Sequence, residues 1–448
     1  MAKYQKYAEY KDSGTDWLGE IPTHWDVQPT KRFFRLIAEP APENNDYELL
    51  SVYTEIGVKP RKELEQKGNK ASTTDGYWLV KKGDIVVNKL LAWMGAVGYS
   101  EYDGVTSPAY DILRPTKKLN PKFYHYLFRT KIANMEFKRW SRGIMEMRLR
   151  LYFDELGRIA MPFPTFKEQN EIVNFLDHET AKIDSLIAKQ EKLIELLKEK
   201  RQAVISHAVT KGLNPNVAMK DSGVEWLGQV PEHWTVKPNK YLLDFVTSGS
   251  RGWAQFYADT GSLFFRIANL TRDTIEPKLE SLQFVEPPQG SEGERSKIKI
   301  GDLLISITAD LGSVCVADSS IQNGYVSQHV ALCRPQKLYN SRWLAYYILS
   351  DSAKEQLLGS GYGGTKIQLS LEDIKELVIA VPPKEEQILI ANYIDEKLNQ
   401  FEHLIKQANK LVMTLQERRT ALISSAVTGK IDLRNWQHPN EAKTELNL

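Results

Sequence analysis

The chain of 448 residues is long enough for two or three domains with full cores. Its 59 Lys and Arg residues nearly balance 57 Asp and Glu residues, and the net charge of +2 excludes a histone-like or strongly polybasic protein. Cys315 and Cys333 have no CxxC spacing and support neither a disulfide framework nor a zinc site. Without an apolar leader or a run of about 18 apolar residues, the chain is expected to be soluble and cytoplasmic, with no membrane contact.

A leading segment opens the chain and returns later. KDSGTDWLGEIPTHWDVQP, from Lys11 to Pro29, recurs as KDSGVEWLGQVPEHWTVKP, from Lys220 to Pro238. Its Trp, Pro and Gly residues show no periodicity, which predicts an ordered loop held by buried indoles. His24 and His233 recur in these segments outside any recognised catalytic arrangement of nucleophile and acid. This favours packing or a backbone hydrogen bond over catalysis.

A domain-sized block follows each leading segment, at about 30–160 and 239–380. Both blocks contain short apolar runs bounded by Gly, Asp and Pro, as is typical of strands. These runs are Tyr47–Tyr53, Asp84–Asn88 and Ala109–Arg114, then Leu263–Asn269, Asp302–Thr308 and Val326–Arg334. An aromatic-rich helix is predicted after them, near Phe123 and near Trp343. The combination indicates an α+β domain rather than a pure β barrel.

Shared landmarks indicate that the two blocks have the same fold. The matched positions are Gly83-Asp84 with Gly301-Asp302, Gly104 with Gly324, Ser107 with Ser327, and Arg114-Pro115 with Arg334-Pro335. Between them the residues differ almost completely. Diverged loops on a duplicated scaffold are what two readers of different ligands would show. Neutral drift after duplication is the alternative.

A long helix is predicted after each block. Glu168–Val209 and Glu386–Val427 align without a gap at a constant shift of 218 positions, with prolines before and glycines, Gly212 and Gly429, after them. Apolar residues at steps of three, four and seven positions, which fit a 3.5-residue repeat, predict a seam that pairs the two helices with each other or with another protein. Roughly 40 residues give a rod of about 60 Å. The predicted seam consists of Ile172, Leu176, Ile183, Leu186, Leu193, Leu197 and Val204, then Ile390, Ile394, Phe401, Leu404, Leu411, Leu415 and Leu422.

Common catalytic motifs are missing. The sequence has no GxxxxGK[ST], no HExxH, no clustered metal ligands and no [ND]PP[FYW]. Gly359–Gly364 matches GxGxxG but follows a helical stretch, so a flexible loop leading to Lys366 is the better interpretation. Glu65-Gln66-Lys67 is a weak nuclease candidate without a counterpart in the second copy. No catalytic or metal-binding residue is predicted.

Polar loop residues in both blocks are candidates for DNA contacts. Lys and Arg can hold phosphates, whereas Arg, Asn and Gln can make paired hydrogen bonds to base edges. Taken singly, a residue of this kind is more often a solvated surface residue. The duplicated architecture is what strengthens the case that these residues contact DNA. They are Lys59, Arg61, Lys62, Lys89, Trp93, Arg142 and Arg148, then Arg251, Arg266, Asn269, Arg272, Ser306, Thr308, Tyr325, Gln328, His329 and Lys366.

This pattern resembles the specificity subunit of type I restriction-modification systems. The resemblance is carried by KDSG-x-x-WLG-x-x-P-x-HW at both unit starts, by LGRIAMPFPTFKEQ and IKELVIAVPPKEEQ, and by helices ending in AVTKGL and AVTGKI. It implies two target-recognition domains that each read half of a split, asymmetric DNA sequence. The two conserved helices would form an antiparallel coiled coil as a spacer. The implied fold is a tandem α+β duplication.

The resemblance also implies partners and domain limits. A non-catalytic subunit would dock two methyltransferase (M) subunits on double-stranded DNA, and restriction/translocase (R) subunits would complete the complex. S-adenosylmethionine, ATP and Mg would belong to those partners, with no cofactor in this chain. The expected divisions are 1–165 and 213–383 for leading segments with recognition domains, 166–212 and 384–430 for helices, and 431–448 for a polar tail. The alternatives are a coiled-coil scaffold without DNA contact and a divergent nuclease.

Overall fold

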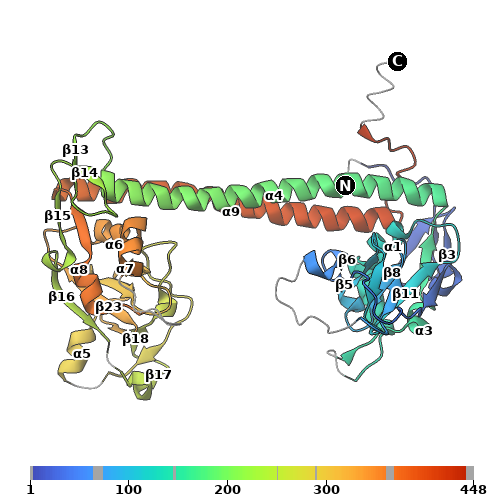
Figure 1. The fold of residues 1–448 in the computed structure, drawn as a ribbon, viewed down its shortest axis with the longest axis horizontal. Helices are drawn as coiled ribbons and strands as arrows, with labels where there is room; N and C mark the ends of the chain where they lie inside the picture. Colours follow the sequence, from blue (N-terminus) through green and yellow to red (C-terminus); the bar gives the residue numbers. More distant parts are fainter. Residues whose placement is uncertain are drawn as a thin grey trace. The chain divides into compact units, whose positions relative to one another are not determined.

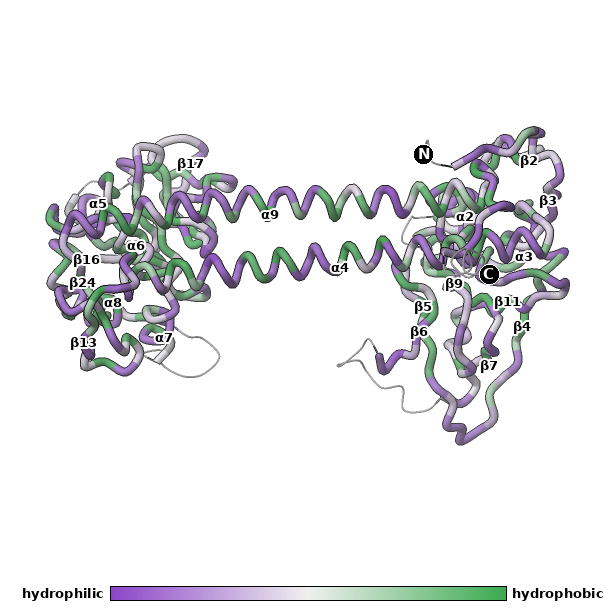
Figure 2. The backbone as a smooth tube through the Cα atoms, turned by 90° about the horizontal axis from the view of Figure 1, so that it is seen from above, coloured by the Kyte–Doolittle hydropathy of each residue, from purple (hydrophilic) through white to green (hydrophobic). Residues whose placement is uncertain are grey.

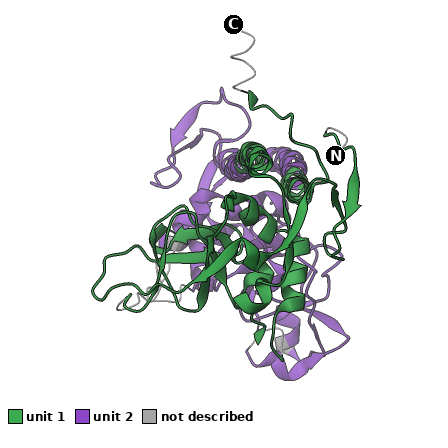
Figure 3. Cartoon of the chain, turned by 90° about the vertical axis from the view of Figure 1, so that its right-hand side faces the viewer, with its two compact units in different colours: residues 1–190, 410–448 green, residues 191–409 purple. Residues whose placement is uncertain are grey.

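The chain folds into two compact units, which Figure 3 colours separately. Unit 1 comprises Met1–Gln190 and Lys410–Leu448, and unit 2 comprises Glu191–Asn409. The computed structural model describes residues 4–63, 74–144, 148–249, 251–287, 290–359 and 368–439. Two long helices, α4 (Phe166–Lys211) and α9 (Lys384–Val427), each contribute one part to unit 1 and the other part to unit 2 (Figure 1).

Each unit is built around a four-stranded antiparallel sheet with the same strand order. The order is β4-β11-β8-β9 in unit 1 and β16-β23-β20-β21 in unit 2. The tandem α+β duplication predicted from the sequence is therefore confirmed. The strands are β4 (Phe34–Ile37), β8 (Ile85–Asn88), β9 (Val97–Tyr99) and β11 (Tyr110–Pro115), then β16 (Leu243–Ser248), β20 (Leu303–Ser306), β21 (Val314–Val316) and β23 (Val330–Pro335).

The leading segments also fold alike. Each forms a short hairpin and then a strand that pairs with the strand immediately before a long helix. The predicted loops thus contain three- and four-residue strands, which are too short to leave a periodic signal. The hairpins are β1 (Tyr10–Asp12) with β2 (Glu20–Pro22) and β13 (Met219–Asp221) with β14 (Gln229–Pro231). The pairs beside the long helices are β3 (Asp26–Pro29) with β12 (Ala160–Phe163) and β15 (Thr235–Pro238) with β24 (Val378–Val381).

The segments between these shared strands differ in architecture. Unit 1 carries two separate antiparallel strand pairs, whereas unit 2 carries a second four-stranded sheet of order β17-β19-β18-β22 with one parallel pairing. The unit 1 strands are β5 (Leu50–Tyr53), β6 (Gly57–Pro60), β7 (Trp78–Val80) and β10 (Gly104–Thr106). Those of unit 2 are β17 (Tyr257–Ala258), β18 (Ser262–Phe265), β19 (Phe284–Val285) and β22 (Tyr325–Val326).

Short helices complete both units. The aromatic helices predicted near Phe123 and Trp343 are α1 and α6. Helix α1 buries one aromatic face, whereas α6 is buried all round from Trp343 to Leu349. The helices of unit 1 are η1 (Thr30–Arg32), η2 (Arg61–Glu63), η3 (Ala92–Met94), α1 (Pro121–Phe128), α2 (Lys131–Trp140) and α3 (Phe153–Leu156). Those of unit 2 are η5 (Asn239–Tyr241), η6 (Trp253–Phe256), η7 (Ile267–Asn269), α5 (Ser291–Ser296), α6 (Ser341–Leu349), α7 (Asp351–Gly359) and α8 (Leu371–Glu376).

The long helices are antiparallel within each unit and lie side by side in Figure 2. In unit 1 the main core contains Ile172 and Leu176 from the start of α4 with Leu422 from the end of α9. In unit 2 the main core contains Val209 from the end of α4 with Ile390 from the start of α9. Each long helix thus takes part in the cores of both units.

Four predicted seam residues lie beside the seam instead of in it. Leu186, Leu193, Leu404 and Leu411 are 41%, 43%, 46% and 44% exposed. In an α-helix, the residue four positions after Ile183 stays on the buried face, whereas the residue three positions after it turns to the flank. The middle of the seam therefore consists of Ile183, Ile187, Ile194 and Leu197 with Phe401, Ile405, Ala408, Val412 and Leu415, all buried or half-buried.

Candidate nucleic-acid interface

A clamp joins each leading segment to the first turn of a long helix. His24 Nε2 lies 3.0 Å from Glu168 Oε2, and the Tyr7 hydroxyl donates to Glu168 Oε1 at 2.6 Å. In unit 2, His233 Nε2 lies 2.8 Å from Glu386 Oε2. The histidines pack against aromatic rings, as one of the two expectations had it, but their hydrogen-bond partners are carboxylates far along the chain and not backbone groups. The separation in sequence hid this contact.

A paired hydrogen bond braces each central sheet. Arg114 donates from Nε and Nη2 to the two oxygens of buried Asp84, at 2.9 and 2.8 Å. Arg334 donates in the same way to Asp302, with both distances 2.7 Å. These residues are landmarks that recur in the two halves of the sequence. Such paired charge-assisted bonds are strong and fix geometry. The matched Asp and Arg residues therefore form a brace that stabilises the central sheet of each unit.

A latch attaches each aromatic helix to a long helix. On α1, Tyr126 donates to Asp177 of α4 at 2.7 Å, and Lys122 Nζ lies 3.5 Å from the same carboxylate. On α6, Tyr346 donates to Asp395 of α9, and Arg342 donates to Asp395 at 2.7 Å. Burial raises the pKa of Tyr126 and Tyr346, and the hydrogen bonds to Asp177 and Asp395 raise it further. The latches hold each variable block on its helices.

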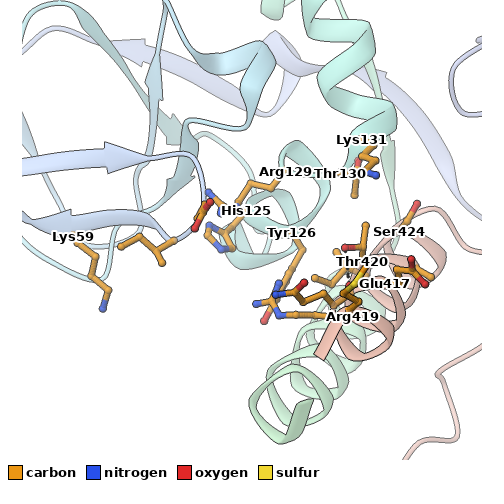
Figure 4. Close-up of a pocket in the computed structure, with 16 residues that line it drawn as sticks. Lys59, His125, Tyr126, Arg129, Thr130, Lys131, Glu417, Arg419, Thr420 and Ser424 are labelled. Carbon is orange, nitrogen blue, oxygen red and sulfur yellow. Dashed lines mark hydrogen bonds between the residues drawn. The ribbon is translucent and has the colours of Figure 1, made fainter. Parts of the chain in front are cut away.

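In unit 1, a cleft of about 800 Å³ lies between the β5–β6 hairpin, helices α1 and α2, and the last part of α9 (Figure 4). Of the predicted DNA contacts, Lys59 lines it and donates from Nζ to the Tyr102 hydroxyl at 3.1 Å. Lys131 and Arg419 add cationic groups, and Glu55 and Glu417 add carboxylates.

Arg129 also lines this cleft, and sequence reasoning missed it. Its guanidinium donates to the backbone oxygens of Tyr53, Thr54, Gly95 and Val97 at 2.9 to 3.3 Å. Burial, together with the charge of nearby Arg419, lowers its pKa to about 10. Only tertiary structure brings these carbonyls together, so no local signal marks the residue.

The other predicted residues of unit 1 form two groups. Arg61 and Lys62 follow β6, and Lys62 pairs with Glu48. The second group surrounds η3 and the start of the segment after α2. It consists of Lys89, Trp93, Arg142 and the exposed Arg148. Lys89 lies 3.3 Å from Asp111, and Arg142 lies 2.5 Å from Glu155. The ring of Trp93 lies 5.1 Å from Lys138 Nζ.

In unit 2, three predicted residues line one cavity of about 300 Å³. They are Arg266, Gln328 and His329. Gln328 Nε2 and His329 Nε2 lie 2.9 Å apart. Tyr325 packs against Trp253, another lining residue, with ring centroids 5.5 Å apart. The structure thus gathers residues from two separate stretches of sequence around one hollow.

The remaining predicted residues of unit 2 have other roles. Asn269 is fully buried and donates to the backbone oxygens of Lys278 and Ser281, and its side-chain oxygen accepts from the Arg266 amide. These local bonds turn the chain, which is why the predicted strand ends at Phe265 and a 3-10 turn follows. Asn269 therefore stabilises its own loop, and its side-chain amide is not available to contact a base.

Ser306 is likewise buried, and it donates to the Thr308 backbone oxygen at 2.8 Å. Thr308 bridges to Gln368, and Arg272 donates to Asp310 at 2.6 Å. Arg251 is exposed. Lys366 and the Glu65–Lys67 candidate lie outside the described residues.

Within the described ranges, no three His, Cys, Asp or Glu side chains are grouped as metal ligands. None of the helices in those ranges is long and apolar enough to cross a membrane.

A family model described as "Type I restriction modification DNA specificity domain" matches residues 26–196 and 289–412, which is more than half of the chain. The chain belongs to this family and is a specificity subunit of the type I class, the component that recognises DNA sequence.

Known relatives agree with the family. The chain is 22% identical to the EcoBI specificity subunit of Escherichia coli over 82% of this chain and 77% of that protein. It is 23% identical to the putative MjaX specificity subunit of Methanocaldococcus jannaschii over 96% of this chain and 99% of that protein.

Solved structures share the fold. A chain from work on complex assembly and conformational transition of the type I R-M system aligns with a TM-score of 0.70 at 17% identity, covering 92% of this chain and 99% of its own. The HsdS subunit from Thermoanaerobacter tengcongensis aligns with a TM-score of 0.55 at 16% identity, covering 92% and 98%.

Proposed function

We propose that this specificity subunit reads a split, asymmetric DNA sequence, with one half contacted by unit 1 and the other half by unit 2. The observation that carries the proposal is the contrast within each unit. The sheet order, clamp, brace and latch recur in both units, whereas the inserted strands differ. Recognition is commonly carried by variable segments on a rigid scaffold.

The two reading surfaces have different chemistry. In unit 1, Lys59, Arg61 and Lys62 follow one another on β6 and η2, where a row of cations suits the phosphate backbone. In unit 2, Arg266 and Gln328 border a hollow and can form paired hydrogen bonds with a base edge. Loops of both units would enter the major groove.

The long helices would set the separation of the half-sites and dock two methyltransferase subunits. The exposed leucines of each long helix, Leu186 and Leu193 on α4 and Leu404 and Leu411 on α9, support this role because exposed apolar side chains favour partner contact. Restriction and translocation subunits would join the same complex. The chain itself would be non-catalytic and act in the cytoplasm, with S-adenosylmethionine, ATP and Mg held by its partners.

The experiment is a genome-wide map of adenine methylation in the native host with and without this gene. Loss of one split, asymmetric motif is the expected result, and it would give both half-sites at once. If no motif disappears while the partner methyltransferase is expressed, the proposed reading of DNA is wrong and a scaffold role replaces it.

A further inference from the structure

The cavity of unit 2 has the walls of a binding site for a flat aromatic group. Trp253 and Phe264 are buried and stacked, with ring centroids 5.9 Å apart and planes 19° apart. Tyr257 is 44% exposed, and its ring centroid lies 5.6 Å from that of Phe264. All three residues line the cavity. An aromatic wall with an exposed ring beside it offers a stacking surface to a planar ligand.

Two buried polar atoms of the lining residues have no hydrogen-bond partner among the described residues. They are the hydroxyl oxygen of Ser327, a residue that is only 6% exposed, and Nε of Arg266. Leaving a buried polar group without a partner is energetically costly, so such groups call for an explanation. A ligand that accepts a hydrogen bond would satisfy both atoms.

The corresponding serine of unit 1 has a hydrogen-bond partner within its own loop. Ser107 matches Ser327 in the duplicated sequence, and its Oγ accepts a hydrogen bond from the Ala109 amide at 3.2 Å. The unsatisfied hydroxyl is therefore a feature of the unit 2 copy and not a requirement of the shared fold.

The volume limits the ligand to a small one. About 300 Å³ is at the lower end of the range of roughly 300–1,000 Å³ for small-molecule pockets. We propose that this cavity takes one unstacked nucleobase from the half-site that unit 2 reads, which rests on the proposed function. The base stacks on Tyr257 and accepts hydrogen bonds from Arg266 Nε and the Ser327 hydroxyl. The energy of unstacking then becomes part of the selection of sequence.

The experiment uses the complex of this chain with its methyltransferase subunits and the target found by methylation mapping. A fluorescent base analogue that brightens on unstacking, 2-aminopurine or pyrrolocytosine, replaces each base of the unit 2 half-site in turn. The expected result is a bright position distinct from the methylated adenine. Brightening only at the methylated adenine, on a target that the complex binds tightly, overturns the inference. Failure to find any target overturns the proposed function instead.

Variants then assign the bright position to this cavity. Ser327→Ala removes a hydroxyl without a partner, so the free energy of unfolding should stay the same or rise while the bright signal falls. Tyr257→Ala should weaken binding of the target about 5- to 150-fold, as expected for loss of one base–aromatic stack. Tyr241→Ala is the matched control because Tyr241 is 58% exposed and does not line the cavity. A bright signal unchanged in both cavity variants overturns the inference.

Discussion

The central sheets of the two units are copies, but the segments inserted between their strands are not. Asp84 with Arg114 and Asp302 with Arg334 brace the same place in both sheets. Beside these braces, unit 1 builds two strand pairs and unit 2 builds a second sheet with a cavity. The comparison shows that the braced central sheet stays the same while the segments inserted between its strands change.

The largest expected effect comes from the shared brace. Asp302→Ala should lower the free energy of unfolding by about 3–5 kcal/mol, because it removes the buried carboxylate that accepts both hydrogen bonds from Arg334. Asp84→Ala should cost somewhat less, because Arg114 keeps its ion pair with Glu39. Urea unfolding measures the change. Asp259→Ala, at an exposed position, is the control. A large loss in one unit and none in the other would break the equivalence of the two scaffolds.

The next effect separates the units by pH. Burial, together with the charges of Arg129, Lys122 and Arg419, lowers the pKa of His125 in α1 from 6.5 to about 3. Its Nδ1 accepts a hydrogen bond from the Tyr99 amide, which requires the neutral ring. The corresponding position of α6 is Ala345, which cannot titrate.

Because the folded pKa lies below the unfolded pKa, the contribution of His125 is complete above about pH 6.5 and is lost as the pH falls toward 3. Unit 1 should lose at most about 1.4 kcal/mol of stability per pH unit in that window. Urea unfolding at several pH values tests this. His125→Asn should flatten the dependence, whereas His403→Asn on the exposed surface of α9 should not. An unchanged acid dependence in His125→Asn contradicts the assignment.

A smaller effect concerns specificity. Arg266→Ala should cost about 1–3 kcal/mol of discrimination at one base of the unit 2 half-site and leave the other half-site unchanged. Binding measurements on single-base variants of the target provide the test. An equal loss of affinity for all sequences would show that Arg266 binds a phosphate and does not read a base.

The smallest effect is electrostatic. Lys62→Ala should weaken binding to all sequences alike and reduce the slope of log affinity against log salt by about 1. Glu48→Ala is the matched control because it removes the partner of Lys62 and leaves the lysine free. A slope that is unchanged in Lys62→Ala would show that this lysine does not neutralise a phosphate.

The sequence predicted the duplication, the long helices and the aromatic helices because these depend on repeats and periodicity over many residues. It could not predict partners far apart in the chain. His24 with Glu168 and Arg129 with its four carbonyls exist only after folding. The phase of the helix seam also failed at Leu186 and Leu193, since a leucine three residues from a buried position can fit the pattern and still lie on the flank.

For the candidate DNA contacts, too, the sequence suggested residue types but not their tertiary partners. Residue type suggested Arg266, Gln328 and Asn269 equally. The structure places the first two around a cavity and gives the third to the backbone of its own loop. Local sequence does not show whether an amide will be used internally.

The most direct test of the central claim is to exchange residues 30–160 for the corresponding block of a relative with a different, known target, and then to map methylation. We expect one half of the motif to change to the relative's half, while the other half and its separation stay the same. A change in both halves, or in neither while the chimera still supports methylation, would contradict the assignment of one half-site to each unit.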